Sequence, residues 1–329
     1  MAQQTDARMS EARDIIARIS DAYSRRIVGQ ERLRTSLLVA LIAGGHVLLE
    51  SVPGLAKTTA ASTLADTIDG TFRRIQCTAD LLPSDITGTQ VFEQRTGSFR
   101  TVLGPVHGNI VLLDEINRSS AKAQSAMLEA MQERQTTIGG ETHELPDPFL
   151  VIATQNPIEQ EGTYELPEAQ MDRFLLKEIL QYPSPEEELE VLNRLDSGVL
   201  APRNHAEKVA SLADVLLLQE VAETVHVSPE VRNYIVGLAY VTRNPEQYIG
   251  AGKARLIRYG ASPRASIAFV RASRAYALLN GRDHVVPDDI VALRHVVLRH
   301  RVLLSYEAEA EGVRSEELID AVFGAVPTP

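Results

Sequence analysis

Residues 51–58, with the sequence SVPGLAKT, stand between a short apolar run and a helical pattern. The apolar run, 46–50, is bounded by glycine and proline, as a buried parallel strand often is. A tight loop between such a strand and a helix presents backbone N–H groups and the positive end of the helix dipole, which together bind phosphate. The segment is close to the phosphate loop G-x-x-x-x-G-K-[ST], and this order of elements constrains the chain to an α/β fold.

Two positions of this loop depart from the pattern. Ser51 replaces the first glycine and Ala56 replaces the glycine before Lys57. Each replacement adds a Cβ where the backbone approaches phosphate or adopts an unusual φ. We expect Lys57 to reach the β- and γ-phosphates and the Thr58 hydroxyl to bind Mg²⁺. A surface turn before a helix is the alternative interpretation of the loop when it is taken alone.

Two carboxylates give the second signal, because Asp114 and Glu115 directly follow the apolar residues 110–113. Ligands of parallel sheets bind outside the carboxyl ends of the strands, where the phosphate loop also lies. We expect Asp114 to hold the Mg²⁺ shell and Glu115 to orient the attacking water. A third apolar run, 149–154, is soon followed by Asn156, whose amide can hold the water or the γ-phosphate; an Asn-Pro turn is the alternative.

Strand candidates alternate with helical patterns in the first half of the chain, which predicts an α/β layered fold with a parallel sheet. The expected strands cover 46–50, 71–76, 110–113, 149–154 and 174–180. Residues 89–103 and 134–146 have the turn chemistry of hairpins.

The sequence of the second half of the chain predicts mainly helices. Ser184, Pro185 and Glu187 form a capping box with proline at the first helical position. We therefore expect an α/β domain over 1–184 and an all-α domain over 185–329.

Composition excludes several classes of protein. Lys and Arg number 33 against 44 Asp and Glu, so the net charge of −11 disfavours a general nucleic-acid binder. A single cysteine, Cys77, excludes a disulfide scaffold, and we expect it to be a small buried thiol rather than a redox group. No apolar run approaches the ~18 residues of a membrane span. The polar N-terminus does not resemble a targeting signal, so the expected location is cytoplasmic.

Two further patterns give structural expectations. Ser10 is expected to cap the first helix, whose apolar residues recur at helical spacing. A cluster near the C-terminus is expected to form a basic helix surface, with phosphate contact as the alternative; its members are Arg294, His295, Arg299, His300 and Arg301.

Six motifs together resemble the MoxR family of AAA+ ATPases. They are 27–30 (IVGQ), 51–58 (SVPGLAKT), 113–118 (LDEINR), 153–164 (ATQNPIEQEGTY), 167–174 (PEAQMDRF) and 260–265 (GASPRA). The resemblance covers the chain from about 27 to about 310. It implies a three-layer αβα P-loop domain followed by an all-α lid, with the two hairpins at the positions of the helix-2 and pre-sensor insertions.

The resemblance also implies a set of site residues. The nucleotide-binding residues are Val28 and Gly29 at the adenine, and Pro53, Gly54, Leu55, Ala56, Lys57, Thr58 and Thr59 around the phosphates. The Mg²⁺ ligands are Thr58 and Asp114. The catalytic residues are Glu115, Asn156 as a polar sensor, Arg173 as an arginine finger for a neighbouring subunit, and Arg264 as a second sensor. Whether Arg264 acts on its own or on the neighbour's nucleotide stays open, as does the role of Arg118.

The function that follows is Mg-dependent ATP hydrolysis in a homo-oligomeric ring, expected to be a hexamer. The resemblance implies a chaperone-like role in maturing, activating or inserting metal into partners, often proteins with a von Willebrand factor A domain. Two alternatives are a nucleotide-gated scaffold with little hydrolysis, suggested by Ser51, and a nucleic-acid motor. The acidic charge and the few basic residues of the hairpins disfavour the motor.

Overall fold

The computed structural model describes residues 2–157, 164, 166–200 and 205–329. Part of the resemblance motif at 153–164 therefore lies outside the described residues. Contacts divide the chain into two compact units, an α/β unit and a helical unit. The α/β unit comprises Asp14–Leu166 and Glu178–Leu217, and the helical unit comprises Met1–Arg13, Pro167–Lys177 and Leu218–Pro329. The expected domain boundary at 184/185 stays a prediction.

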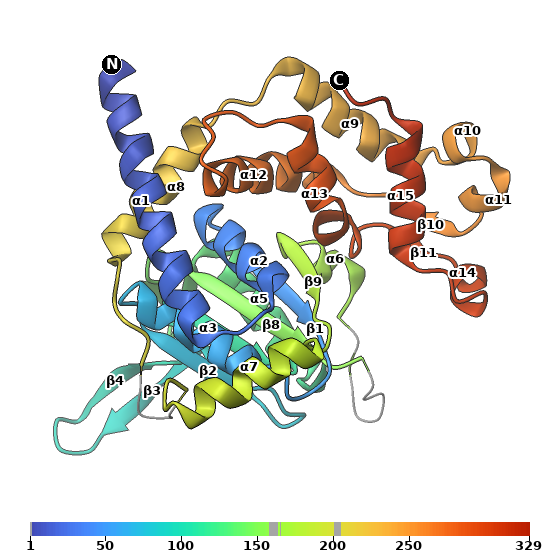
Figure 1. Cartoon of the computed structure of the whole chain (residues 1–329). Helices are drawn as coiled ribbons and strands as arrows, with labels where there is room; N and C mark the ends of the chain where they lie inside the picture. Colours follow the sequence, from blue (N-terminus) through green and yellow to red (C-terminus); the bar gives the residue numbers. More distant parts are fainter. Residues whose placement is uncertain (1, 158–163, 165, 201–204) are drawn as a thin grey trace. The chain divides into compact units, whose positions relative to one another are not determined.

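A five-stranded sheet forms the centre of the α/β unit, as the alternating pattern predicts (Figure 1). Its strand order is β2-β5-β8-β1-β9, and the pairs β2–β5, β5–β8 and β8–β1 are parallel. The strands are β1 (Val47–Glu50), β2 (Phe72–Gln76), β5 (Ile110–Asp114), β8 (Leu150–Gln155) and β9 (Leu176–Ile179). The α/β fold class is confirmed.

Burial of the central strands explains their uninterrupted apolar sequences. All five residues of β5 and the first five residues of β8 are buried, as in strands that are covered on both faces. Helix α2 (Glu31–Ile42) packs against β1, and α3 (Lys57–Thr67) packs against β2 and β5. Helix α5 (Ala121–Glu133) follows β5 through the short 3-10 helix η1 (Ile116–Arg118), and the side chain of Ser120 caps α5.

The last strand is shorter than the expected run 174–180. Phe174 lies in the turn before β9. The reason is that its carbonyl accepts a hydrogen bond from the Arg301 side chain at 2.6 Å, so this group is not available to a strand ladder. The apolar pattern of residues 174–180 cannot indicate that a side-chain donor from a distant part of the sequence binds this carbonyl.

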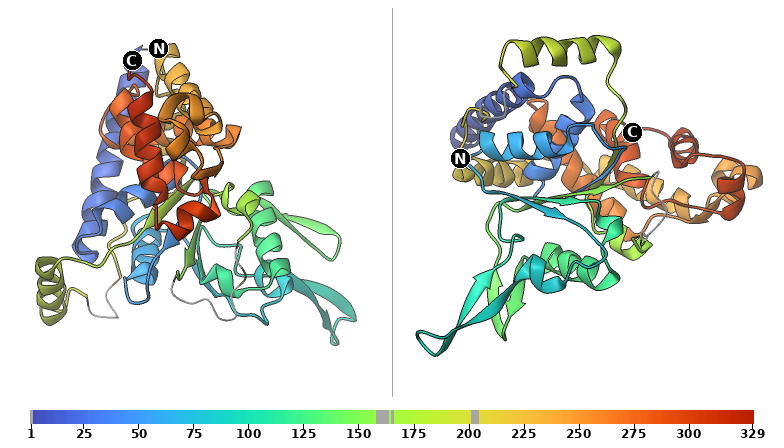
Figure 2. Two further views of the ribbon diagram at one scale, coloured as in Figure 1. Left: turned by 90° about the vertical axis from the view of Figure 1, so that its right-hand side faces the viewer. Right: turned by 90° about the horizontal axis from the view of Figure 1, so that it is seen from below.

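Two hairpins extend from the α/β unit, and both are confirmed. Strands β3 (Gly88–Glu93) and β4 (Ser98–Leu103) pair antiparallel, as do β6 (Gln135–Ile138) and β7 (Glu141–Glu144). The hairpins lie side by side in both views of Figure 2. A Cβ on Gly139 would stand 2.1 Å from the Gln90 side chain, so the β6–β7 turn packs directly on β3. The short helix α4 (Pro83–Thr87) precedes β3, and α7 (Pro185–Asp196) follows β9 with the capping box that the sequence predicts.

The helical unit is built mainly from α9 (Pro229–Arg243), α12 (Pro263–Leu279), α13 (Pro287–Leu298) and α15 (Ser315–Ala325). Ser228 and Ser262 cap α9 and α12, each followed by proline at the first helical position. Helix α8 (Leu212–Thr224) precedes them in the chain. The smaller elements are α6 (Glu168–Met171), α10 (Glu246–Ile249), α11 (Ala251–Ala254), β10 (Ile257–Tyr259), β11 (Leu303–Leu304) and α14 (Tyr306–Ala310). Helix α8 runs across the boundary between the units.

The first helix, α1 (Ala2–Arg26), begins before the expected cap. Ser10 lies inside α1, so the prediction that it caps the helix is wrong. Met9 and Ala12, on either side of Ser10, are both buried. Packing of these apolar side chains therefore stabilises the helix beyond Ser10 toward the N-terminus. None of the helices in the described ranges is long and apolar enough to cross a membrane.

Candidate nucleotide-binding site

The carboxyl ends of three adjacent strands bring the first site residues together. Strand β1 leads into the loop 51–56, β5 ends at Asp114, and β8 leads to Asn156. The backbone N–H of Ser51 donates to the carbonyl of Gln155 at 3.1 Å, which ties the start of the loop to the end of β8. The phosphate-loop motif, the acid pair and the sensor candidate therefore lie at one edge of the sheet, as the strand pattern predicts.

The loop has the backbone that an anion site requires. Gly54 has φ 87°, and Ala56 has φ 53°, a left-handed conformation that costs an alanine about 1–2 kcal/mol. Ala56 stands at the N-terminus of α3 and makes no side-chain cap, whereas serine side chains cap several other described helices. The first N–H groups of α3 are therefore available to a negatively charged ligand.

Lys57 shares an electrostatic environment with the acid pair. Its Nζ lies 3.5 Å from the carbonyl oxygen of Val52. Burial lowers the pKa of Lys57, while the carboxylates of Asp114 and Glu115 act in the opposite direction. The ammonium group therefore lies within the electrostatic field of both carboxylates.

One hydroxyl orients both acids. Thr154, fully buried on β8, donates to Oδ1 of Asp114 at 2.8 Å and accepts from the backbone N–H of Glu115 at 2.8 Å. Glu115 itself has a left-handed backbone, φ 59° and ψ 53°, which turns the chain sharply after β5. Such strain persists where the surroundings fix it, and it is common at functional sites.

Strand β2 supplies further partners that the sequence analysis missed. Arg74 donates to Oδ2 of Asp114 through Nε at 3.2 Å and through Nη2 at 2.5 Å. Gln76 donates to Oε2 of Glu115 at 3.2 Å. The signal that could have found them is the period of two, because alternate residues of β2 share one face and Gln76 pairs in register with Asp114.

Arg118 and Cys77 also lie beside the acids. Arg118 pairs with Oε2 of Glu115 at 3.1 Å, so its cation acts on the carboxylate of its own chain. Cys77 is buried, as expected, and its N–H donates to the carbonyl of Asp114 at 2.9 Å. Burial raises the pKa of the Cys77 thiol to about 12, which keeps it protonated and unreactive at neutral pH.

The donor set fits a magnesium nucleotide. Thr58 offers a hydroxyl and Asp114 a carboxylate, and oxygen ligands of this kind are those that Mg²⁺ prefers. The uncapped start of α3 and the ammonium of Lys57 offer donors to the phosphate oxygens. A Cβ added to Gly54 would have no atom within 4 Å besides those of Gly54 and its two chain neighbours, so the loop is open on that side.

The expected adenine contact, Val28 and Gly29, lies on a loop that packs against the start of α7. Gly29 has φ 61°, and a Cβ there would stand 2.1 Å from Oε1 of Glu187. The side chain of Gln30 donates to the carbonyl of Gln181 at 3.1 Å. The left-handed backbone therefore favours glycine at position 29, whereas the flexible Glu187 side chain could move aside.

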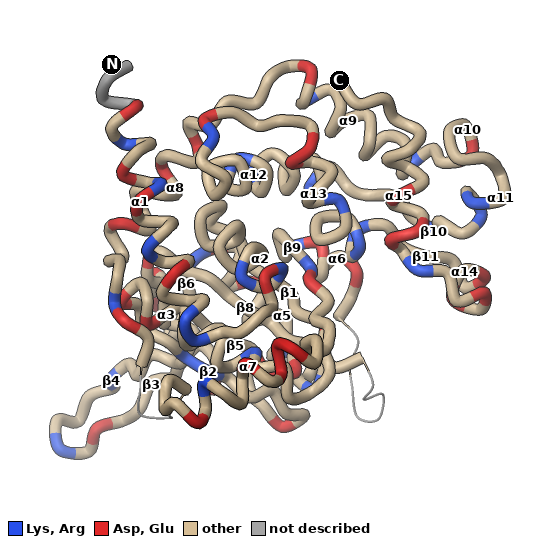
Figure 3. Tube along the Cα trace, in the orientation of Figure 1, with Lys and Arg blue, Asp and Glu red and all other residues tan. Residues whose placement is uncertain are grey.

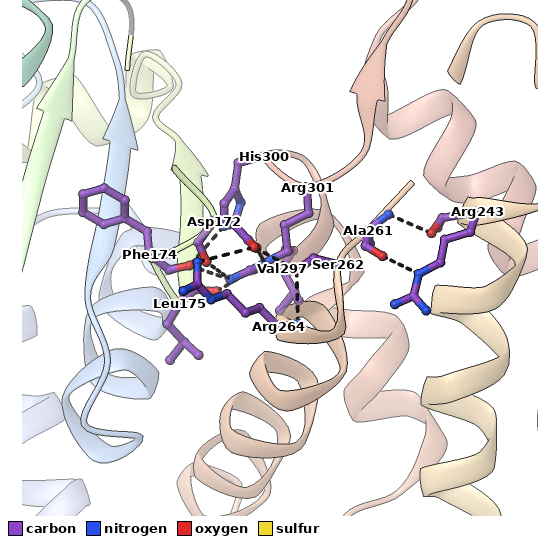
Figure 4. A network of polar contacts seen from close by, with 11 residues as sticks. Asp172, Phe174, Leu175, Arg243, Ala261, Ser262, Arg264, Val297, His300 and Arg301 are labelled. Atoms are coloured by element: carbon purple, nitrogen blue, oxygen red, sulfur yellow. Dashed lines mark hydrogen bonds and ion pairs between the residues drawn. The ribbon is translucent and has the colours of Figure 1, made fainter. Parts of the chain in front are cut away.

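Arg173 and Arg264, the two arginines that the resemblance singles out, belong to the helical unit. Arg173 lies exposed in the turn after α6, and Arg264 lies exposed in the first turn of α12. Asp172 stands between them: its Oδ2 accepts from Ser262 Oγ at 2.8 Å and lies 3.8 Å from Nη1 of Arg264 (Figure 4). The structure thus joins the two arginine motifs through one carboxylate.

The loop before α12 is anchored to α9. Arg243 donates through Nε to the carbonyl of Ala261 at 2.7 Å (Figure 4). The hydroxyl of Thr242 accepts from the Ala261 N–H at 2.9 Å. A Cβ on Gly260 would stand 2.3 Å from the carbonyl oxygen of Thr242. The glycine of the GASPRA motif is therefore required by close backbone contact.

The expected basic surface near the C-terminus is wrong for two of its members. His300 is 3% exposed and Arg301 is 5% exposed. Both side chains donate to the carbonyl of Phe174, Arg301 at 2.6 Å and His300 at 3.1 Å. A contact of Arg301 with phosphate is excluded, because its guanidinium is buried against the chain.

The fold and this site define an AAA+ ATPase domain with an all-α lid. Residues 46–176 match the family model described as ATPase family associated with various cellular activities, and residues 251–322 match the AAA lid domain. The chain is 50% identical over 305 residues to the chaperone MoxR1 of Mycobacterium tuberculosis, covering 93% of this chain and 80% of that protein.

Two further comparisons agree. The chain is 35% identical to the protein MoxR of Paracoccus denitrificans, covering 97% of this chain and 99% of that protein. A crystal structure from Cytophaga hutchinsonii, provisionally named an ATPase, matches with 45% identity and a TM-score of 0.93, covering 100% of this chain and 99% of that one. The chain belongs to the MoxR family of AAA+ ATPases.

Proposed function

We propose that this protein hydrolyses ATP with Mg²⁺ as a homo-oligomeric ring, which we expect to be a hexamer, and uses the cycle to remodel partner proteins in the cytoplasm. The observation that carries the proposal is the hydroxyl of Thr154, which holds Asp114 and the backbone of Glu115 in one geometry at the edge of the sheet where the Lys57 loop also begins. A scaffold that only binds nucleotide has no need for a strained, oriented Glu115.

Each residue of the sheet edge has a role in this proposal. Lys57 and the first amides of α3 bind the β- and γ-phosphates, and Pro53, Leu55 and Thr59 belong to the same binding segment. Thr58 and Asp114 hold Mg²⁺, which when bound neutralises charge on the phosphate oxygens. Glu115 orients and polarises the attacking water, and Asn156 contacts the γ-phosphate or that water.

The ring follows from the proposed arginine finger. Arg173 is assigned to the nucleotide of a neighbouring protomer, where a guanidinium stabilises the charge that develops on the γ-phosphoryl group. Such a finger contributes on the order of 10³–10⁵ in rate, so an isolated protomer would turn over slowly. Arg264 is assigned to coupling the phosphate state to the lid.

Steady-state phosphate release tests the hydrolysis. The parent protein should release phosphate with Mg²⁺, and Glu115→Gln should bind ATP but retain it uncleaved. If Glu115→Gln hydrolyses like the parent, Glu115 does not activate the water. If the parent binds ATP without releasing phosphate, the protein is a nucleotide-gated scaffold instead.

A mixing experiment tests the action of Arg173 in trans. Arg173→Ala should bind ATP normally and turn over at least about 10³-fold more slowly. Lys57→Ala should lose its own site but keep its finger. Rings that contain both variants should regain about a quarter of the parental turnover if sites act independently, because one interface in four pairs an intact site with an intact finger. No recovery in mixed rings would assign Arg173 to its own protomer.

The chaperone-like role is supported by the relative MoxR1, which is named a chaperone. We propose a partner with a von Willebrand factor A domain, into which the cycle inserts metal or which it activates. The β3–β4 hairpin carries charges of both signs, including Glu93 and Arg95, rather than a basic stripe (Figure 3). This distribution favours a protein client over nucleic acid. ATP-dependent metal loading of such a domain tests the role, and salt-dependent DNA binding would contradict it.

A further inference from the structure

The Arg301 side chain makes five hydrogen bonds within the chain, and Arg301 lies outside every motif of the proposed site. It is 5% exposed and follows the end of α13. Nε donates to Oδ1 of Asp172 at 2.8 Å. Nη2 donates to the carbonyls of Asp172 at 3.2 Å and Phe174 at 2.6 Å. Nη1 donates to the carbonyls of Leu175 at 3.1 Å and Val297 at 2.5 Å.

These five bonds use all five N–H donors of the guanidinium. Three of the acceptors are backbone carbonyls of the turn that contains Arg173, and two of these, at Asp172 and Phe174, flank it in sequence. The backbone of Arg173 therefore cannot shift without breaking charge-assisted hydrogen bonds in a buried site. The turn is also fixed from within, because the N–H of Arg173 donates to Gln170 and that of Phe174 to Met171.

Asp172 extends the same contact to α12. One carboxylate oxygen accepts from Arg301, and the other accepts from the hydroxyl of Ser262. Ser262 Oγ in turn accepts from the N–H of Arg264 at 3.1 Å, at the first turn of α12. Figure 4 shows this chain of contacts from the Arg173 turn to the start of α12.

We propose that Arg301 is a positioning residue that holds Arg173 in the geometry needed at a neighbouring protomer's nucleotide, and that Asp172 makes the Arg173 turn and the Arg264 end of α12 move together. This inference rests on the proposed function of Arg173. Arg301 does not touch nucleotide, since its donors are all engaged within the chain. It acts through the backbone of the turn, so a change at Arg301 moves Arg173 without removing it.

The buried guanidinium of Arg301, which clamps the Arg173 turn through these hydrogen bonds, stays charged. Desolvation lowers the pKa of Arg301 to about 10, and the Asp172 carboxylate opposes this shift. The guanidinium is therefore protonated at neutral pH. Lysine in its place would keep the charge but has three donors on a single atom, so it cannot span the carbonyls on both sides of Arg173.

The first test compares Arg301→Lys with the parent ring. Phosphate release should fall by roughly 10²-fold, since a displacement of about 1 Å at a catalytic group costs that much. The affinity for a fluorescent ATP analogue should stay within about twofold of the parent, because the phosphate loop belongs to a different unit. Arg294→Lys is the matched control on α13, the helix that precedes Arg301: Arg294 pairs with Asp320 near the surface, so the change should leave turnover unchanged.

The second test separates positioning from a loss of stability. Rings that combine Arg301→Lys with Lys57→Ala protomers should regain about a quarter of the parental turnover, because Lys57→Ala protomers present a correctly held finger. Amide hydrogen exchange should become faster in a peptide spanning 168–177 and stay unchanged in peptides of α9. If Arg301→Lys does not fold, Asp172→Asn takes its place with the same expectations, since it keeps the shape of the side chain.

Three results would overturn the inference. Parental turnover and parental exchange in Arg301→Lys would show that the clamp does not position Arg173. A loss of turnover that Lys57→Ala protomers fail to restore would place the defect in the variant's own site or its folding. If Arg173→Ala rings are inactive and Arg301→Lys rings are fully active, the positioning role of Arg301 is wrong but the proposed role of Arg173 stands. If Arg173→Ala rings are fully active, the proposed role of Arg173 as an arginine finger is itself wrong.

Discussion

The hydroxyl of Thr154 donates to Asp114 at 2.8 Å from the neighbouring strand, and the same oxygen accepts from the next N–H along the chain, that of Glu115. A buried hydroxyl thus fixes the metal-ligand candidate and the water-activating candidate relative to each other. Neither contact is local in sequence, since Thr154 is 40 residues from Asp114 and 39 from Glu115.

Replacing Thr154 with valine should therefore affect both stability and turnover. Thr154→Val leaves a buried carboxylate oxygen and a partly buried N–H without this partner, which costs about 1–3 kcal/mol of unfolding free energy. Turnover should fall roughly tenfold or more, because both acids lose orientation. Urea unfolding and phosphate release measure the two effects, with Thr154→Ser as the control that keeps the hydroxyl. Equal behaviour of the two variants would contradict the role given to the hydroxyl.

Arg74 should compete with Mg²⁺ for Asp114. Both cations seek the same carboxylate, and the guanidinium also repels a dication placed beside it. Arg74→Met should lower the Mg²⁺ concentration needed for half-maximal turnover by about three- to tenfold. Arg73→Met, on the opposite face of β2, removes the same charge and is the matched control. A Mg²⁺ dependence that is identical in both variants would show that Arg74 does not compete at this carboxylate.

Ala56 carries a backbone conformation that suits glycine better. Its φ of 53° costs about 1–2 kcal/mol, while glycine adds flexibility to the unfolded chain worth about 0.4–1 kcal/mol. Ala56→Gly should therefore raise the unfolding free energy by about 0.5–1 kcal/mol and preserve nucleotide binding. Ala60→Gly, a buried position in the interior of α3, should lower it by about 1 kcal/mol. A loss of stability in Ala56→Gly would show that this conformation is not strained.

His300 should make stability fall in acid. Burial and the adjacent Arg301 hold the pKa of His300 well below its usual value, so the folded protein binds this proton less readily than the unfolded chain. The contribution of neutral His300 to the free energy of unfolding is complete above pH 6.5, which is about the pKa of histidine in the unfolded chain. This contribution is lost as the pH falls toward the lower pKa of His300 in the folded protein, by up to about 1.4 kcal/mol per pH unit. His300→Gln should flatten the pH dependence of urea unfolding between pH 7 and about 5. An unchanged slope in His300→Gln would assign the effect to other groups.

Gly260 should not tolerate a side chain. In Gly260→Ala the Cβ would meet the carbonyl oxygen of Thr242 at 2.3 Å, and relieving this overlap should cost about 1–3 kcal/mol. Gly252→Ala is the matched control, because its Cβ enters open space in the short helix α11 and should be neutral or stabilising by about 0.5–1 kcal/mol. Thermal unfolding distinguishes them, and equal melting temperatures would refute the steric argument.

Much of the fold was accessible from local patterns. The buried runs that became β1, β5 and β8 are uninterrupted apolar segments, and serine-proline pairs mark the starts of α7, α9 and α12. Burial on both faces and capping act within a few residues, so sequence windows record them. The prediction that Ser10 caps the first helix failed because the end of that helix is set by tertiary packing, which a short sequence window does not record. A serine that could cap a helix also fits inside one when packing extends the helix past it.

The sequence by itself determined the chemistry of the sheet edge, because each strand end carries its functional residues directly after an apolar run: the loop around Lys57, the acids at 114 and 115, and Asn156. Only the tertiary structure decided which other side chains hold them. Arg301 reaches Asp172 across 129 residues, and Arg74 reaches Asp114 across 40. An arginine in a local pattern resembles a solvated charge. A distant carboxylate that only folding brings close converts it into a fixed contact, which is buried at Arg301 and half-exposed at Arg74.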